Sequence, residues 1–150
     1  MKRPGSEAAR AVLAAFALPA DAGLEAITTG HINESWYLRA QGDEVLLQWL
    51  NHGVFPEADA VQDNLETVLD HLQAQTPELS VPTLRRTVDG PRRLRTDHGL
   101  WRAFTFQPDC VVHERPVDGA MARAAGAVLG AVLHGLAALP TGRIRPVLAR

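Results

Sequence analysis

The stretch from residue 27 to residue 55 constrains the fold of this 150-residue chain more than any other. A short apolar segment runs into Gly30 and a polar turn, and two strand-like runs follow at residues 35–40 and 45–50. Glycine at such a turn lets the backbone adopt positive φ and lie close to another group. The pattern predicts three short strands joined by a glycine turn and a short loop.

Helical patterns flank this unit. Ser6 is placed to cap a first helix over residues 7–17, and Pro56 is placed to begin a long helix that ends near Gln75. The long helix has one apolar stripe, made of Val61, Leu65, Val68, Leu69 and Leu72.

The second half returns to strand character before a last helix. Residues 83–88 and 92–96, around the turn Asp89-Gly90-Pro91, predict a hairpin. Residues 99–106 predict a stronger strand, on which Trp101, Ala103 and Thr105 share one face and Leu100, Arg102, Phe104 and Phe106 the other. Asp118 is expected to cap a helix that reaches residue 139, with an apolar stripe of Met121, Ala125, Val128, Leu129, Val132 and Leu136.

Short strands interrupted by one crossing helix indicate an α+β fold with an antiparallel sheet of about five strands, and with a helix at each end. The length is that of one domain. A net charge of −2 argues against nucleic acid or an anionic membrane as a partner. Cys110 is the single cysteine, which fits a reducing cytoplasm, and no apolar run approaches about 18 residues. We expect a cytoplasmic protein without a transmembrane segment.

The catalytic motifs that could be expected of such a chain are missing from the sequence. None of the six histidines begins an HGD-like or HRD-like loop, and none has the spacing of an HExxH metal site. There is no GxSxG nucleophile elbow. The sequence therefore predicts no catalytic residue and no metal ligand within these 150 residues.

Several short motifs, in this order and spacing, resemble the amino-terminal lobe of the N-acetylhexosamine kinases. These belong to the aminoglycoside phosphotransferase group of protein-kinase-like enzymes. The resemblance runs from about Leu24 to Leu139 and includes Gly30-His31-Ile32-Asn33, Leu46-Leu47-Gln48 with Asn51, Val54-Phe55-Pro56, Asn64, His71-Leu72, Trp101-Arg102 with Phe104 and Phe106, Leu129-Gly130 and Leu139-Pro140.

The resemblance implies a nucleotide site. The loop with Gly30, His31, Asn33 and Ser35 would cover the ATP phosphates, whereas the residues alone favour an ordinary hairpin turn. Gln48 would occupy the strand position of the phosphate-pairing lysine. Trp49 stands where the family tends to have arginine, which leaves no cation in that strand; by itself, Trp49 is a core or edge aromatic.

The rest of the implied site lies on the long helix and at the end of the last strand. Glu66, or alternatively Asp63, would be the acidic partner of the lysine position, although most helix charges are merely solvated. Thr105, Phe106 and Gln107 would begin the hinge whose backbone holds the adenine edge. Cys110 would lie beside that pocket or be a small buried hydrophobe.

By resemblance, residues 1–106 would form the nucleotide-binding lobe, and residues 107–150 the hinge and first helix of a second lobe. The expected function is the ATP-binding lobe of a phosphotransferase acting on a sugar or amino-sugar hydroxyl, with Mg²⁺ in a complete homologue. The chain as given, whether a truncated product, a fragment or a genuine half-protein, is expected to be inactive. The alternative is a non-catalytic interaction module.

Two surfaces are candidates for contacts with a partner. Residues 119–139 would self-associate or meet the second lobe through an exposed apolar stripe. Five arginines form a dense cluster, which is either a solvated hairpin face or a patch for a phosphate-bearing partner: Arg85, Arg86, Arg92, Arg93 and Arg95.

Overall fold

The computed structural model describes residues 3–28, 30, 32–40, 42–106, 113 and 115–147. Five strands form one antiparallel sheet in the order β1-β2-β3-β5-β4. The strands are β1 (Gly23–Ile27), β2 (Glu34–Ala40), β3 (Asp43–Trp49), β4 (Leu94–Thr96) and β5 (Gly99–Thr105). The helices are α1 (Ser6–Ala11), α2 (Ala58–Gln75) and α3 (Gly119–Leu136), with 3-10 turns η1 (Leu13–Phe16) and η2 (Thr141–Arg143). The α+β fold, the sheet of about five strands and the crossing helix are confirmed.

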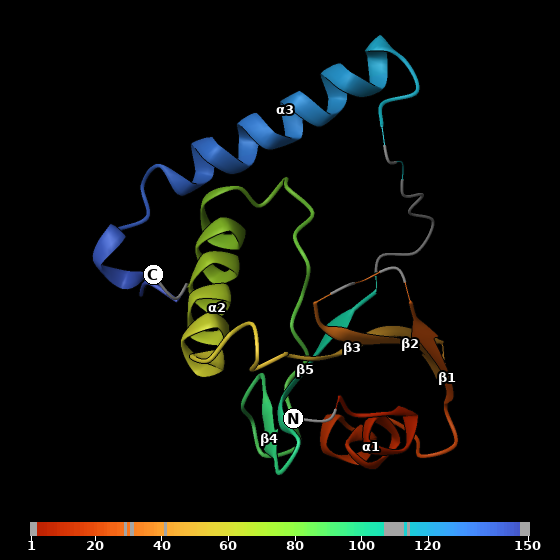
Figure 1. The fold of residues 1–150 in the computed structure, drawn as a ribbon. Helices are drawn as coiled ribbons and strands as arrows, with labels where there is room; N and C mark the ends of the chain where they lie inside the picture. The colour runs from red at the N-terminus through yellow and green to blue at the C-terminus, as the bar shows by residue number, and fades with distance from the viewer. Residues whose placement is uncertain are drawn as a thin grey trace.

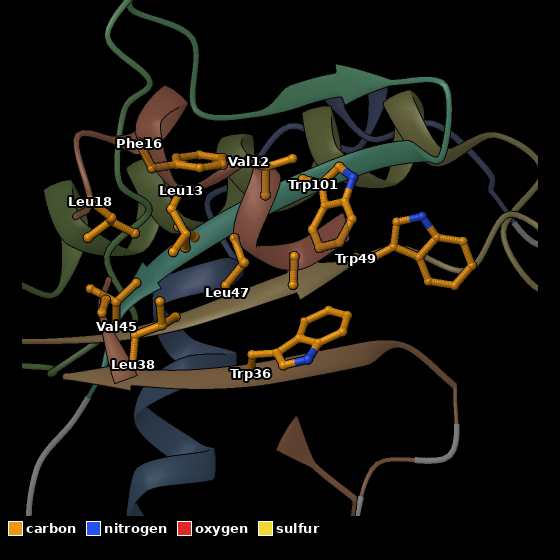
Figure 2. Close-up of a cluster of buried hydrophobic side chains, with 13 residues drawn as sticks. Val12, Leu13, Phe16, Leu18, Trp36, Leu38, Val45, Leu47, Trp49 and Trp101 are labelled. Carbon is orange, nitrogen blue, oxygen red and sulfur yellow. The ribbon is translucent and has the colours of Figure 1, made fainter. Parts of the chain in front are cut away.

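One face of the sheet holds the main hydrophobic core. Because side chains alternate along a strand, Val45, Leu47 and Trp49 of β3 point to the same side and are each almost fully buried. Their cross-strand neighbours Trp36, Leu38, Trp101 and Ala103 join them. The segment of α1 and η1 covers this face with Leu13 and Phe16, as Figure 2 shows. Trp49 is thus a core aromatic, as the sequence alone indicated.

The opposite face of the sheet lies toward α2 (Figure 1). Leu69 of α2 packs with Leu84 and Phe104, and Leu46 and Leu65 lie against this cluster. The predicted stripe is only partly buried: Leu69 and Leu72 are buried, whereas Val61, Leu65 and Val68 are half-buried. The three half-buried side chains line a cavity between α2 and the chain that follows α3.

Three local predictions were wrong. Residues 83–88 form no regular strand: Leu84 makes an isolated bridge to Phe104, and β4 pairs with β5 instead. The first helix ends at Ala11 and continues as η1, with Gly5 rather than Ser6 at the N-cap. The long helix begins at Ala58, two residues after Pro56.

The last helix, α3, has the predicted cap but little packing. The Met121 backbone N–H donates to Asp118 Oδ1 over 2.7 Å. Of the eighteen residues of α3, Gly135 alone is buried, and Val128, Leu129 and Leu133 are each more than half exposed.

By length and composition, α3 is the one helix in the described part of the chain that could cross a membrane, with a mean hydropathy of 1.3 and 6% of its window buried. The sequence shows no unbroken apolar run here, because Arg123, Gly126, Gly130 and His134 interrupt the apolar residues.

The carboxy-terminal end of α3 crosses α2 closely. A Cβ at Gly135 would lie 3.0 Å from side-chain atoms of both Leu72 and Thr76, so any larger residue would displace these side chains by a few tenths of an ångström. The His71 Nε2 atom lies 3.0 Å from the Gly135 carbonyl oxygen. The far end of α3 rises away from the sheet in Figure 1.

Candidate nucleotide site

A continuous row of polar side chains crosses the α2-facing side of the sheet. Gln48 on β3 donates from Nε2 to Ser35 Oγ on β2, over 3.0 Å. On its other side, Gln48 Oε1 accepts from Arg102 Nε and Nη2 on β5, over 3.0 and 2.5 Å. The row exists because Gln48 pairs with both Ser35 and Arg102 in the strand register, which places all three on one face.

The row continues onto α2. Arg102 Nη1 donates to Gln62 Oε1 over 3.3 Å, and Gln62 Nε2 donates to Glu66 Oε1 over 3.0 Å. Gln62 is fully buried, and it also reaches the Arg92 carbonyl oxygen at 3.4 Å. Residues Gln62 and Glu66 are four apart and therefore neighbours on one helix face. Two strands, β3 and β5, are thereby linked to α2 by neutral amides around one cation.

Arg102 is the charged centre of this row. Among the described residues its guanidinium forms no ion pair with a carboxylate, although seven other pairs involve arginine. Burial lowers the pKa of Arg102 to about 10. Its Cζ lies 5.2 Å from the centroid of the Phe104 ring, a distance that allows cation–π attraction. A cation held by neutral groups in a partly dry site attracts an anion strongly.

The loop between β1 and β2 is held against the end of β3 by two asparagines. Asn33 Oδ1 accepts from the Asn51 backbone N–H over 3.1 Å, and Asn51 Nδ2 donates to the Ile32 carbonyl oxygen over 3.0 Å. Gly30 borders open space, since a Cβ there would meet only the Asn33 carbonyl oxygen at 3.7 Å. The loop is thus attached at the same end of β3 as Gln48.

The predicted hinge lies at the opposite end of β3. The Thr105 backbone N–H donates to the Thr83 carbonyl oxygen over 2.9 Å, and the Phe106 N–H donates to the Glu44 carbonyl oxygen over 2.8 Å. Both amides are therefore engaged in the sheet. The Phe106 ring meets Tyr37 edge-on, with ring centroids 4.9 Å apart. An aromatic pair thus lies beside the hinge on the face that carries the polar row.

Glu44 forms the polar border of this end. It accepts hydrogen bonds from the Tyr37 hydroxyl, over 2.8 Å, and from the Arg39 guanidinium. The bond from Arg39, followed by the bond from Tyr37, lowers the pKa of Glu44. The hydrogen bond to Glu44 is also the largest cause of a raised pKa at Tyr37.

The structure brings some of the predicted site residues together and separates others. Ser35, Gln48 and Glu66 belong to the polar row; Asp63, the alternative to Glu66, instead forms ion pairs with Arg93 and Arg145. Gly30 and Asn33 lie in the loop at the same end, and Thr105 and Phe106 lie at the other end of β3. His31, Gln107 and Cys110 lie outside the described residues.

Arg102 and Gln62 were not predicted as site residues. Sequence alternation did place Arg102 on the face of Leu100 and Phe104, but the resemblance drew attention to β3 for the missing cation. The useful signal was an arginine among buried apolar residues on a central strand, since an arginine is rarely buried without a partner.

The arginine cluster is neutralised by acidic side chains. Arg92, Arg93 and Arg95 pair with Asp70, Asp63 and Asp59, which lie along one side of α2. Arg85 pairs with Asp43, and Arg86 donates to the Gly90 carbonyl oxygen. The cluster joins the β4 region to α2, and this arrangement does not favour a patch for a phosphate-bearing partner.

A cavity of about 780 Å³ opens beside the polar row. Its wall on the sheet side includes Arg102. On the helix side it is lined by Val61, Leu65 and Val68 of α2, and on the third side by Leu136 at the end of α3 and Ile144 after η2. Within the described residues no group of three or more histidine, cysteine or acidic side chains could hold a metal ion.

No family model matches the chain. Among solved structures, the chain is similar to a microcompartment-associated aminopropanol kinase, with a TM-score of 0.64 over 88% of its length at 17% sequence identity. It spans 40% of that kinase chain. The similarity confirms the fold implied by the resemblance: that of the amino-terminal lobe of a small-molecule kinase.

Proposed function

We propose that this chain is the ATP-binding lobe of a phosphotransferase that acts on the hydroxyl group of a small molecule, with a sugar or amino sugar as the preferred acceptor class. The observation that supports this best is the polar row Ser35–Gln48–Arg102–Gln62–Glu66 on the α2-facing side of a kinase-like sheet. In kinases, the strand lysine and the helix glutamate that position the phosphates meet on the corresponding side.

The two ends of β3 have different chemistry, and so do the two ends of a nucleotide, which carries charged phosphates at one end and an aromatic base at the other. At one end, the Asn33–Asn51 loop and Gln48 offer polar groups and open backbone beside Gly30. At the other end, Tyr37 and Phe106 offer aromatic surface next to the hinge. The register places Val45 opposite Thr105 and Gln48 opposite Arg102, three residues or about 10 Å apart along the strand. We place the phosphates at the first end and the base at the second.

Thr105 and Phe106 would meet the base with groups other than their backbone amides. The amide groups of Thr105 and Phe106 already donate within the sheet, so neither is available to the base. Phe106 would instead border the pocket with its ring, and Thr105 with its carbonyl group, because the Thr105 side chain points to the opposite face of the sheet.

Phosphoryl transfer depends on groups that orient the acceptor hydroxyl and hold magnesium. The 150 residues contain no HGD-like loop, and the described residues contain no metal cluster. We therefore propose that this chain binds nucleotide but does not by itself transfer phosphate. Acceptor choice and turnover would depend on a second lobe.

Titration with ATP tests this function. Wild-type protein should bind ATP, and Gly30→Val should weaken binding by about tenfold or more, because a branched side chain occupies the space beside the loop backbone. The matched control is Gly23→Val on β1, where a Cβ meets nothing within 4 Å. ATP binding that is equal in both variants, or absent from the wild type, overturns the proposal.

The alternative is an interaction module with the same fold. The exposed apolar residues of α3, among them Val128, Leu129 and Leu133, are the observation that favours it. A wild-type chain that binds no adenine nucleotide but forms a defined complex through α3 would support this alternative.

A further inference from the structure

We propose that Arg102 of β5 is the phosphate-binding cation of this lobe, and that Gln48 of β3 holds it in place. This inference rests on the proposed nucleotide function and names the residue on which the phosphates would bind. The lysine position and the positive charge would then lie on different strands. Gln48 occupies the lysine position of β3 without a charge, and Arg102 of the neighbouring β5 supplies the charge.

The geometry positions the guanidinium at the lysine position. Two of its nitrogens, Nε and Nη2, donate to the same Gln48 Oε1 atom, which draws the planar group toward β3. The third nitrogen, Nη1, donates to Gln62 on α2. The cation therefore lies between β3 and α2, where a strand lysine and a helix glutamate would meet. Glu66 is linked to it through Gln62 rather than directly.

The guanidinium also has donors to spare. An arginine carries five N–H groups. The described residues accept hydrogen bonds from three of those of Arg102, which leaves two N–H groups without a described partner for a ligand. The fork geometry of arginine matches two phosphate oxygens at once.

The electrostatics favour an anion rather than a neutral ligand. The other described arginines of the α2–β4 region are paired with aspartates. Within the described part of the chain, Arg102 instead donates its hydrogen bonds to amide oxygens, and its guanidinium lies over the Phe104 ring. Burial of an unpaired charge is unfavourable, and an arriving phosphate removes that penalty. The site therefore favours an anion, and with the proposed nucleotide function the ligand class is a polyphosphate, such as the tail of a nucleoside triphosphate.

The experiment compares ATP, tripolyphosphate and adenosine as probes, each titrated into the 150-residue chain and followed by calorimetry. Arg102→Met should weaken ATP and tripolyphosphate binding by about 10- to 100-fold, the usual effect of losing a charge-assisted hydrogen bond, and change adenosine binding by less than about threefold. Arg102→Lys should restore part of the loss. Arg86→Met removes an equal charge from the exposed surface and should leave all three affinities unchanged.

A second variant covers the case in which Arg102→Met fails to fold. Gln48→Glu keeps the size of the side chain and places a carboxylate against the guanidinium, which should lower the affinity for tripolyphosphate by a similar factor. Circular dichroism spectra and melting temperatures establish that each variant is folded before it is titrated.

The outcomes separate the two proposals. If the wild type binds none of the three probes, the nucleotide function fails, and this inference fails with it. If ATP binds, and both Arg102→Met and Gln48→Glu keep the wild-type ratio of ATP to adenosine affinity, the nucleotide function stands and the role of Arg102 is overturned.

Discussion

Asn51 and Asn33 hold each other's segments: Asn33 accepts from the backbone of residue 51, and Asn51 donates to the backbone beside Asn33. Eighteen residues separate the two in sequence, and their bonds attach the β1–β2 loop to the end of β3. Asn51 Oδ1 also accepts from the Gly53 N–H over 3.0 Å, which fixes the turn that leaves β3. The position of the loop at this end of β3 is therefore set by side chains as well as by the strands.

Replacing Asn51 should loosen this loop. Asn51→Ala removes the bonds to Ile32 and Gly53, and we expect it to lower the free energy of unfolding by about 1–3 kcal/mol. Asn51→Asp keeps the acceptor for the Gly53 N–H but loses the donor to Ile32, so it should lie between wild type and alanine. Urea denaturation measures stability, and faster amide exchange at residues 32 and 33 reports the loop. Wild-type exchange in Asn51→Ala would contradict the prediction.

Gly99 should be the least replaceable glycine among those described. Its φ of +116° disfavours any side chain, and a Cβ would lie 1.6 Å from His52 Nε2. Both His52 Nε2 and Trp49 Nε1 lie within hydrogen-bond distance of the His98 carbonyl oxygen, so the imidazole has a partner to lose if it moves. We expect Gly99→Ala to reduce the free energy of unfolding by about 2–4 kcal/mol.

Gly42→Ala separates the two causes. Gly42 has a φ of +90° but open space around its Cβ position, so alanine there should cost about 1–2 kcal/mol from the backbone alone. In Gly99→Ala, the additional change His52→Ala should recover part of the loss. Equal losses at the two glycines would argue against the steric role of His52.

The exposed side of α3 should drive association of the chain. Val128, Leu129 and Leu133 are 55%, 59% and 59% exposed, and a continuous apolar surface of this kind promotes contacts in water. We expect concentration-dependent dimers or larger species by light scattering, and a shift to monomer in Leu129→Glu with Leu133→Glu. The control is Val88→Glu, at an apolar residue that is 66% exposed and far from α3 in sequence. A wild-type monomer at high concentration would contradict the prediction.

Glu44 should make the lobe more sensitive to acid. Its pKa is lowered in the folded state by the bonds from Arg39 and Tyr37, so the folded state binds a proton at this group less readily than the unfolded state. The stabilisation is therefore present above the ordinary glutamate pKa of 4.5 and is lost as pH falls through the lowered value.

Melting temperatures measured against pH test this linkage. The difference between wild type and Glu44→Gln should be constant at neutral pH and shrink as pH falls below 4.5. Glu34→Gln, at a carboxylate that pairs with Arg3, controls for the general loss of a surface ion pair. A difference that does not depend on pH would rule out titration of Glu44 as the cause.

Strand faces were predictable from the sequence because alternation is local. The pattern on residues 99–106 assigned Trp101 and Ala103 to one face and Leu100, Arg102 and Phe104 to the other, and the structure agrees. The cap at Asp118 was equally local.

Strand partners were not predictable in the same way. The turn around Gly90 is real, since the Thr87 N–H reaches the Pro91 carbonyl oxygen over 2.7 Å, but β5 is the better partner for both segments that flank it. The candidate site also depends on which strands pair with each other. Gln48 and Arg102 are 54 residues apart, and only the β3–β5 register brings them together.

The close crossing at Gly135 attaches α3 to the rest of the fold near one end of the helix. The helix is clamped to α2 near its last turn, by the fit of Gly135 against Leu72 and Thr76 and by the contact with His71, and its other end lies about 25 Å away. Since α2 also carries Gln62 and Glu66, it is the element that connects the crossing with α3 to the polar row.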